Sequence, residues 1–133
     1  MLKKAKVARA TIPASDLDRA RAFYSDRLGL ELSDETDPTG LIYNLPNGGS
    51  ILVFKSSGQA SGTHTQLGFD VDDVEAEIAE LKTRGVRFEE YDSPGFKTVN
   101  GIATIEGGKG GWFKDSEGNL LSVFQRVGAG VPS

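Results

Sequence analysis

The spacing of apolar residues in the first half of the chain predicts one strand, one helix and three further strands. β-Prone residues alternate with polar ones over Val7–Pro13, which indicates a strand. Ser15 or Asp16 can cap the following helix. The apolar residues of this helix recur at helical spacing and are Leu17, Ala20, Phe23, Tyr24 and Leu28. Gly29 is expected to end it, because glycine tolerates the left-handed backbone that follows many helices.

Three short strands are predicted after this helix. The first covers Leu30–Asp34. The other two, Gly40–Leu45 and Ser50–Lys55, are joined by Pro46–Gly49, whose composition is typical of a hairpin turn. This β-α-β-β-β order ends at a small polar linker, residues 57–62, that has no periodic pattern.

The same order of elements is predicted again after the linker. A strand over Thr63–Val71 leads to a helix that Asp72 or Asp73 can cap. The buried face of this helix is expected to consist of Val74, Ile78 and Leu81. Gly85 ends the helix, and a strand returns over Val86–Tyr91.

The last third of the chain is predicted to form a loop and then hairpins. Ser93–Asn100 is the loop, with a turn at Pro94 and Gly95. Short strands follow, with a final turn over Asp115–Asn119; they cover Ile102–Ile105, Gly111–Lys114 and Leu120–Gln125. The glycine-rich residues 107–111 suggest a flexible flap over a pocket, and Gly128–Ser133 is expected to fray.

The two halves resemble each other in sequence. Pro13–Arg27 aligns with Asp70–Arg84 at a constant offset of 57 positions, and the closing hairpins align at an offset of 69, which pairs Val53 with Ser122. We therefore predict one domain over residues 1–133, built from a first repeat at about 6–56, a linker at 57–62 and a second repeat at about 63–127.

Strand side chains alternate between two faces, so the strands can be sorted by face. The apolar face should pack under the helices and carries Ala8, Ala10, Ile12, Leu52, Phe54, Thr65, Leu67, Phe69, Leu121 and Val123. The opposite face is mixed in polarity and carries Arg9, Thr11, Val53, Lys55, His64, Gln66, Gly68, Ser122 and Phe124. We expect a pocket on this mixed face.

Composition excludes several classes of function. The formal net charge is -4, and the basic start of the chain has no interleaved aromatic residues, which argues against nucleic-acid binding. The absence of cysteine excludes disulfides, thiolate nucleophiles and cysteine metal sites. No apolar run is long enough to span a bilayer, and no signal peptide is recognisable, so a cytoplasmic protein without a membrane partner is expected.

Several motifs, in a consistent order along the chain, are similar to those of the vicinal oxygen chelate superfamily. They are Ile12–Leu17, Ala22–Tyr24 with Arg27–Leu30, Leu67–Val74, and Gly111–Asn119. This superfamily includes glyoxalases, extradiol dioxygenases and antibiotic-resistance proteins of the bleomycin and fosfomycin type. The resemblance implies an α+β fold in which two βαβββ repeats form a curved mixed sheet around a cavity, with helices on the outer face. It also implies a homodimer, because small members commonly build their cavities with a partner chain.

The metal-dependent members of this superfamily carry His, Gln or Glu at four inward positions. The resemblance maps these positions onto Arg9, Gln66, Val53 and Ser122. A guanidinium repels a divalent ion, valine offers no lone pair, and serine is a poor neutral ligand, so Gln66 alone fits. The usual metal tetrad is therefore absent from the sequence.

Candidate ligand-binding residues lie on the mixed face and its rim. They are Arg9, Thr11, Tyr43, Val53, His64, Gln66, Phe96, Trp112, Ser122 and Phe124. Trp112 is the ring expected to stack on a ligand, since flat rings give a large contact area with few rotatable bonds. Arg9 should face an anion, either on a ligand or on an internal acid such as Asp70 or Glu106. His64 is the only histidine and the candidate catalytic residue, with a solvated side chain as the alternative.

Two functions remain open at this point. The first is a metal-independent small-molecule binder, like the bleomycin-resistance branch, that holds an aromatic or amphiphilic ligand. The second is a glyoxalase-type lyase, isomerase or dioxygenase with a displaced divalent metal site. Its ligands would be His64 and Gln66, with Glu106 as a further candidate.

Overall fold

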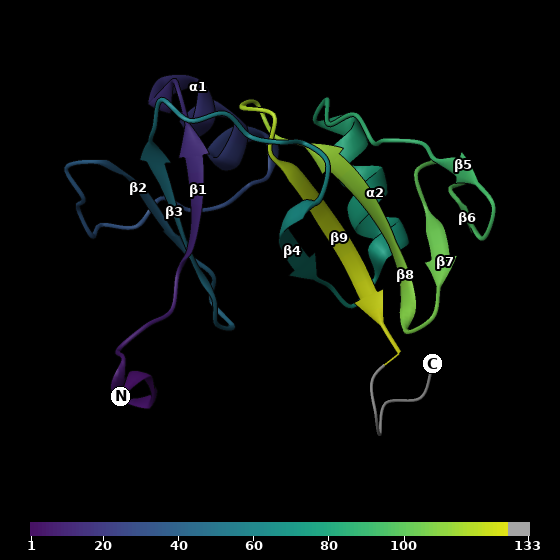
Figure 1. Cartoon of the computed structure of the whole chain (residues 1–133), viewed down its shortest axis with the longest axis horizontal. Helices are drawn as coiled ribbons and strands as arrows, with labels where there is room; N and C mark the ends of the chain where they lie inside the picture. The colour runs from purple at the N-terminus through teal and green to yellow at the C-terminus, as the bar shows by residue number, and fades with distance from the viewer. Residues whose placement is uncertain (128–133) are drawn as a thin grey trace. The chain divides into compact units, whose positions relative to one another are not determined.

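The computed structural model describes residues 1–127, and the segment expected to fray, Gly128–Ser133, lies outside them. The chain has the predicted α+β composition and divides into two compact units (Figure 1). The first unit is Met1–Ser61 with Asp115–Asn119, and the second is Gly62–Lys114 with the chain from Leu120 onward. Every helix within residues 1–127 is too short or too polar to cross a membrane.

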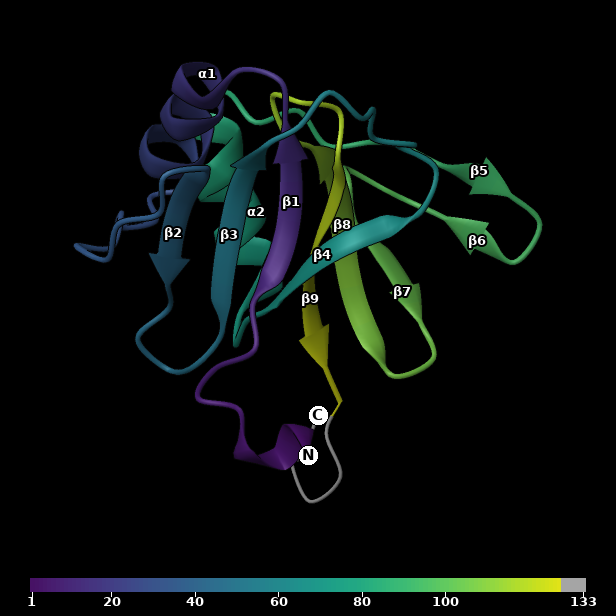
Figure 2. The ribbon, with the colours of Figure 1, turned by 60° about the vertical axis from the view of Figure 1, so that its left-hand side comes forward.

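The first unit is a three-stranded sheet with a helix on one face. Its elements are η1 (Leu2–Lys4), β1 (Ala10–Ala14), α1 (Leu17–Arg21), the π-helical segment η2 (Ala22–Arg27), β2 (Gly40–Asn44) and β3 (Ser50–Lys55). The central strand β3 pairs in parallel with β1 and antiparallel with β2, so that the order is β1-β3-β2 (Figure 2). The chain therefore returns from β1 to β3 by way of the helix and the β2–β3 hairpin.

The second unit is a four-stranded sheet with a helix and a small separate hairpin. Its elements are β4 (Thr65–Asp70), α2 (Val74–Thr83), β5 (Asp92–Ser93), β6 (Phe96–Lys97), β7 (Ala103–Ile105), β8 (Gly108–Lys114) and β9 (Leu120–Arg126). The order in the sheet is β4-β9-β8-β7, with β4 parallel to β9 and the other pairs antiparallel. β9 and β4 repeat the parallel pairing of β3 and β1.

The helix ends confirm the capping signals in the sequence. The carboxylate of Asp16 accepts the backbone N–H of Arg19 at 3.0 Å, and the carboxylate of Asp73 caps α2 in the same way at 3.1 Å. Gly29 and Gly85 follow the two helical segments with φ of 72° and 89°, a left-handed backbone that glycine adopts without strain. Both halves therefore start and end their helices by the same local chemistry.

The face assignment in the last strand of the first unit is wrong by one residue. Val53 is completely buried, and it pairs with Ile12, which is also buried. Tyr43 lies on this same face and stacks on Tyr24 of the helical segment at 5.9 Å. Val53 and Tyr43 therefore lie in the core beneath the helix, while Leu52 and Phe54 lie on the opposite, helix-free face.

The face assignment is correct for the last strand of the second unit but not for the start of β4. Leu121 and Val123 are buried on the side of α2, and Ser122 and Phe124 point the other way. The register of β4 against β9 shifts between Thr65 and Leu67, with Gln66 as the extra residue. This bulge places Thr65 on the helix-free face, because one added residue reverses the alternation.

Two predicted strands are reduced to single bridges. In place of Leu30–Asp34, only Leu32 pairs, with Tyr43, and the Ser33 hydroxyl then accepts the N–H of Glu35 in a local turn. In place of Val86–Tyr91, only Phe88 pairs with β8. The loop expected over Ser93–Asn100 instead contains the hairpin β5–β6, with the predicted turn at Pro94 and Gly95 between its strands.

The glycine-rich segment 107–111 is not a flap, because most of it is the first half of β8. A β-carbon at Gly108 would collide with the carbonyl of Gln125, and one at Gly110 would collide with the Phe124 ring. A β-carbon at Gly111 would lie 2.9 Å from Ile78 of α2. The glycines allow close packing of β8 against its neighbours rather than mobility.

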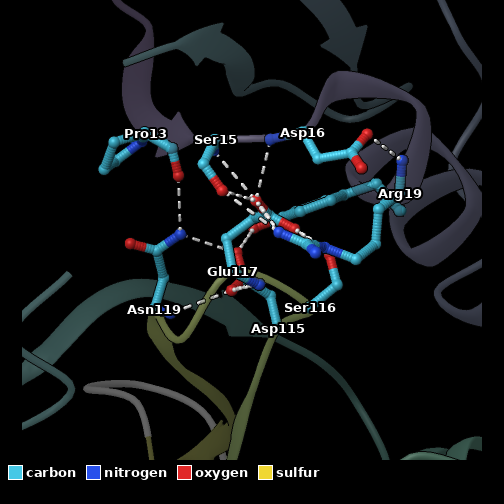
Figure 3. A network of polar contacts seen from close by, with 9 residues as sticks. Pro13, Ser15, Asp16, Arg19, Asp115, Ser116, Glu117 and Asn119 are labelled. Carbon is cyan, nitrogen blue, oxygen red and sulfur yellow. Dashed lines mark hydrogen bonds and ion pairs between the residues drawn. The ribbon is translucent and has the colours of Figure 1, made fainter. Parts of the chain in front are cut away.

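The turn Asp115–Asn119 belongs to the first unit, where it binds the start of α1 (Figure 3). The carboxylate of Glu117 accepts two hydrogen bonds from Arg19, at 2.7 and 2.9 Å, and also the backbone N–H of Ser15 at 2.9 Å. Only 2% of the Glu117 side chain is exposed. The Arg19 guanidinium lowers the pKa of Glu117 to about 2.

A second carboxylate of this turn is buried without a cationic partner in the described chain. Asp115 accepts the hydroxyl of Tyr24 at 2.6 Å and the side-chain amide of Asn119 at 2.8 Å. Asn119 also donates to the carbonyl of Pro13 at 3.0 Å, so both ends of the turn are tied to the first unit. Burial, together with the Asp115 charge, raises the pKa of Tyr24, which therefore stays a hydrogen-bond donor.

Candidate functional site

The register of the second unit places three residues of different kinds in a row across its helix-free face. In this row Trp112 on β8 is directly opposite Ser122 on β9, which is in turn opposite Gly68 on β4. Directly opposed residues on neighbouring strands have their β-carbons about 5 Å apart, so these three positions adjoin. Two of the predicted ligand-binding residues, Trp112 and Ser122, are thus brought together.

Trp112 belongs to a cluster of three aromatic residues. The ring centroids of Phe96 and Trp112 are 5.3 Å apart, and Tyr91 lies 5.5 Å from Phe96 and 6.1 Å from Trp112. The contacts with Trp112 are edge-to-face, the geometry favoured by the quadrupoles of aromatic rings. All three side chains are half-buried, which leaves aromatic surface available for contact.

The indole ring is held in one orientation by a hydrogen bond. Its Nε1–H donates to the hydroxyl of Thr65 at 3.1 Å. Thr65 can accept this bond because the bulge at Gln66 turns it onto the helix-free face. The predicted stacking residue is therefore already ordered, which lowers the entropic cost of binding a flat ligand.

A polar clamp fixes the segment that supplies Tyr91 and Phe96. The carboxylate of Glu90 accepts the Thr98 hydroxyl at 2.6 Å and the backbone N–H of Gly101 at 3.0 Å. These hydrogen bonds lower the pKa of Glu90, so it carries its charge under ordinary conditions. The backbone N–H of Tyr91 donates to the Thr98 hydroxyl at 2.7 Å. The hairpin β5–β6 thus presents its aromatic rings from a closed loop.

The hydroxyl of Ser122 has no hydrogen-bond partner within residues 1–127, although the residue is only 9% exposed. A buried hydroxyl is normally hydrogen-bonded. Gly68, beside it, is exposed. Phe124 is the next residue of β9 on this face, and the guanidinium of Arg126 lies 5.1 Å above its ring.

Arg9 binds an internal acid, but neither of the two acids suggested by the sequence. Its guanidinium donates to Glu35 and to the Ser50 hydroxyl, both at 2.9 Å. Ser50 in turn donates to the side-chain carbonyl of Asn44 at 2.6 Å. Thr11, the other first-unit candidate on the helix-free face, is exposed.

The remaining candidates of the second unit lie at or near the start of β4. His64 is exposed and precedes the strand, and half-buried Gln66 occupies the bulge. Glu106 lies elsewhere in this unit, at a hollow of about 770 Å³ beside the β7–β8 turn that is also lined by Lys109 and Arg126. Within residues 1–127, no three His, Asp or Glu side chains are grouped so as to hold a metal ion.

Comparison with known families identifies the fold. Residues 6–123 match the family described as the Glyoxalase/Bleomycin resistance protein/Dioxygenase superfamily. The chain belongs to this superfamily. No curated protein sequence matches the chain significantly.

Several solved structures share the fold of this chain at low sequence identity. UcmS2 aligns with a TM-score of 0.71 and 21% identity over 91% of this chain and 98% of its own. TnmS3, an antibiotic binding protein from Streptomyces sp. CB03234, aligns with a TM-score of 0.67 and 23% identity over 92% and 96%. The fosfomycin resistance protein FosX from Listeria monocytogenes aligns with a TM-score of 0.67 and 15% identity, over 90% of each chain.

The donor set at the metal positions of the glyoxalase superfamily does not fit a divalent ion in this chain. The register shows that Leu52, not Val53, matches Ser122, since each lies opposite the equivalent residue of the neighbouring parallel strand. Leucine has no lone pair, and Arg9 is a cation bonded to Glu35. Only Gln66 and the Ser122 hydroxyl offer oxygen donors.

The candidate residues predicted from the sequence do not include Tyr91, Thr65 or Gly68, although the alternation places Gly68 on the mixed face. The sequence pattern places Tyr91 at the end of a strand, and its contact with Phe96 depends on the turn that the sequence predicts at Pro94 and Gly95. That turn could have suggested that residues on either side of it meet. The bulge that brings Thr65 to Trp112 has no comparable signal in the sequence.

Proposed function

We propose that this protein is a metal-independent small-molecule-binding protein of the glyoxalase and bleomycin-resistance type. It holds an aromatic or amphiphilic ligand on the helix-free face of the second unit, defined by Thr65, Gly68, Trp112, Ser122 and Phe124. The observation that carries the proposal is the cluster of Tyr91, Phe96 and Trp112, whose rings contact one another and keep exposed surface. The antibiotic-binding and resistance proteins among the structural relatives agree with a binding role.

The chemistry of the face favours binding over metal catalysis. A flat ligand that stacks on such rings gains about 1 kcal/mol per aromatic contact beyond the burial of its surface. The metal positions carry Arg9, Gln66, Leu52 and Ser122, which do not make a divalent site. Metal independence is accordingly part of the proposal.

The test uses Trp112 as its own reporter, because it is the only tryptophan of the chain. Indole emission is followed while a planar aromatic anion, fluorene-2-carboxylate, or a planar aromatic cation, proflavine, is added. We expect saturable quenching by at least one probe, with about tenfold weaker binding in Phe96→Ala. Val99→Ala is the matched control, since Val99 is 63% exposed in the same loop. Quenching that never saturates with either probe would contradict the proposal.

The enzymatic alternative is tested by metal analysis of tag-free protein. The proposal predicts no stoichiometric Ni, Zn, Fe or Mn in the purified wild type. Metal that is retained at one equivalent and disappears in His64→Ala would establish the displaced site instead.

A homodimer and a cytoplasmic location belong to the same proposal. Both follow from the resemblance and composition set out above, and the dimer would place a second copy of each binding face in one particle. Light scattering coupled to size-exclusion chromatography should give about twice the 14.2 kDa chain mass.

A further inference from the structure

Gly68 occupies a strand position where its backbone does not require glycine. Its φ lies outside the left-handed region, where the glycines of the turns lie. Glycine in a strand interior weakens the strand and commonly marks a place where something approaches the backbone closely. The reason for glycine at this position is therefore space rather than conformation.

The space above Gly68 adjoins the Ser122 hydroxyl. A β-carbon at position 68 would lie 2.9 Å from Ser122 Oγ, closer than such atoms approach in proteins. Any larger residue would press on this hydroxyl, whereas glycine leaves it accessible beside an exposed stretch of backbone. The chain thus combines an available hydroxyl with an open slot on one side of it.

The other side of the hydroxyl is occupied by the aromatic cluster. Ser122 lies between Trp112 and Gly68 in the sheet register. Within residues 1–127, Asn119 Oδ1 of the first unit is the one side-chain polar atom that is both fully buried and without a hydrogen-bond partner. Ser122 Oγ also lacks a partner, so it is not fully buried and keeps some contact with solvent. A flat molecule against Trp112 would have its edge within reach of both the hydroxyl and the slot.

We infer that Ser122 selects ligands by donating its hydroxyl hydrogen to an oxygen on the edge of a planar aromatic ring, and that Gly68 makes room for that oxygen. The ligand class is then an aromatic ketone or phenol rather than a pure hydrocarbon ring. Ligands that lack such an oxygen forgo this hydrogen bond and bind more weakly, whereas the hydroxyl itself can still contact solvent. This inference rests on the proposed function.

The test compares 9-fluorenone-2-carboxylate with fluorene-2-carboxylate, which have the same rings and charge and differ by one ketone. Titration calorimetry of the wild type should give about fivefold tighter binding of the ketone. In Ser122→Ala the preference should disappear while fluorene-2-carboxylate keeps its affinity within twofold. Gly68→Ala should weaken the ketone at least fivefold, because the new methyl group displaces the hydroxyl.

The control is Thr104→Ala, which removes an exposed strand hydroxyl from β7 and should keep the ketone preference. Thermal unfolding of each variant verifies that the fold is retained. Equal affinity of the two probes for the wild type, or a preference that survives in Ser122→Ala, would overturn the inference and leave the proposed function standing. Failure of both probes to bind the wild type overturns the inference, and if proflavine also fails the proposed function falls with it.

Discussion

The two units place different side chains at matching positions of their helix-free faces. In each sheet, one residue of the central strand lies opposite one residue of the neighbouring parallel strand and one residue of the neighbouring antiparallel strand. The first unit fills this row with Ile42, Leu52 and Thr11, and the second fills it with Trp112, Ser122 and Gly68. A duplicated backbone thus carries two aliphatic side chains and an exposed threonine in one half, and an aromatic ring, a hydroxyl and a gap in the other.

Polar groups are both paired and unpaired in each unit, since Asn119 Oδ1 of the first unit lacks a partner within residues 1–127 and Glu90 of the second unit is bonded to Thr98, but the groups at the compared positions differ. In the first unit Arg9 is bonded to Glu35 and Ser50, and Arg19 is bonded to Glu117. In the second unit the Ser122 hydroxyl has no partner within residues 1–127. We propose a stabilising role for the charged network of the first unit and a recognition role for the Ser122 hydroxyl of the second.

The largest expected effect comes from removing the buried carboxylate of the first unit. Glu117→Ala should lower the free energy of unfolding by about 3 kcal/mol, because Arg19 and the N–H groups of Ser15 and Asp16 lose their acceptor. Urea denaturation followed by circular dichroism measures the change. Glu106→Ala, an exposed acid in a turn, should change it by less than about 0.5 kcal/mol. A loss below 1 kcal/mol for Glu117→Ala would contradict the assigned role.

Acid should remove the same stabilisation. The pKa of Glu117 is lowered from 4.5 to about 2 in the folded protein, so folding is favoured by its ionised form. Its contribution is fully present above about pH 4.5 and is lost as the pH falls toward 2. The difference in stability between the wild type and Glu117→Gln, at most about 3 kcal/mol, should shrink over this window. A difference that is constant from pH 6 to 2.5 would refute the ionic account.

Making the second unit resemble the first should impair binding without a large loss of stability. Ser122→Leu reproduces the Leu52 position and fills the space beside Gly68. We expect about tenfold weaker binding of 9-fluorenone-2-carboxylate by calorimetry. Leu52→Met, a volume-conserving change in the first unit, should leave the affinity within twofold. Equal effects of the two variants would mean that the units do not differ in this respect.

The smallest expected effect is at Arg9. Its ion pair with Glu35 is partly exposed, so Arg9→Ala should cost about 1 kcal/mol of stability in urea denaturation. The affinity for both fluorene probes should stay within twofold, since the guanidinium is already bonded within the first unit. A tenfold loss of affinity with unchanged stability would instead restore the ligand-binding role that the sequence predicted for Arg9.

The sequence predicted the elements well where local chemistry decides them. The caps at Asp16 and Asp73 and the glycines after both helices are set by side-chain and backbone preferences within a few residues. The hairpin turns at Pro46–Gly49 and Asp115–Asn119 were found for the same reason. The family motifs are built from these same local features, which is why they predicted the superfamily.

Which residues lie on each face of a sheet depends on how the strands pair, and the sequence pattern does not specify that pairing. Ile51, Leu52, Val53 and Phe54 form an unbroken apolar run, so alternation could not tell which residues lie beneath the helix. The offset of 69 between the closing hairpins therefore makes Val53 the equivalent of Ser122. The strand registers instead make Leu52 the equivalent of Ser122, because Leu52 lies opposite Thr11 and Ser122 lies opposite Gly68. The bulge at Gln66 and the network of Glu117 join segments far apart in the chain and were missed for that reason.

The most direct test of the account maps where a ligand binds. Amide nitrogen–proton spectra of labelled protein are recorded while 9-fluorenone-2-carboxylate is added, with the single indole N–H signal as the marker of Trp112. We expect saturable shifts that concentrate on the Trp112 indole and on the amides of Gly68 and Ser122 and are small at Ile42, Leu52 and Thr11. Shifts that are largest in the first-unit row, with an unmoved indole signal, would contradict this expectation.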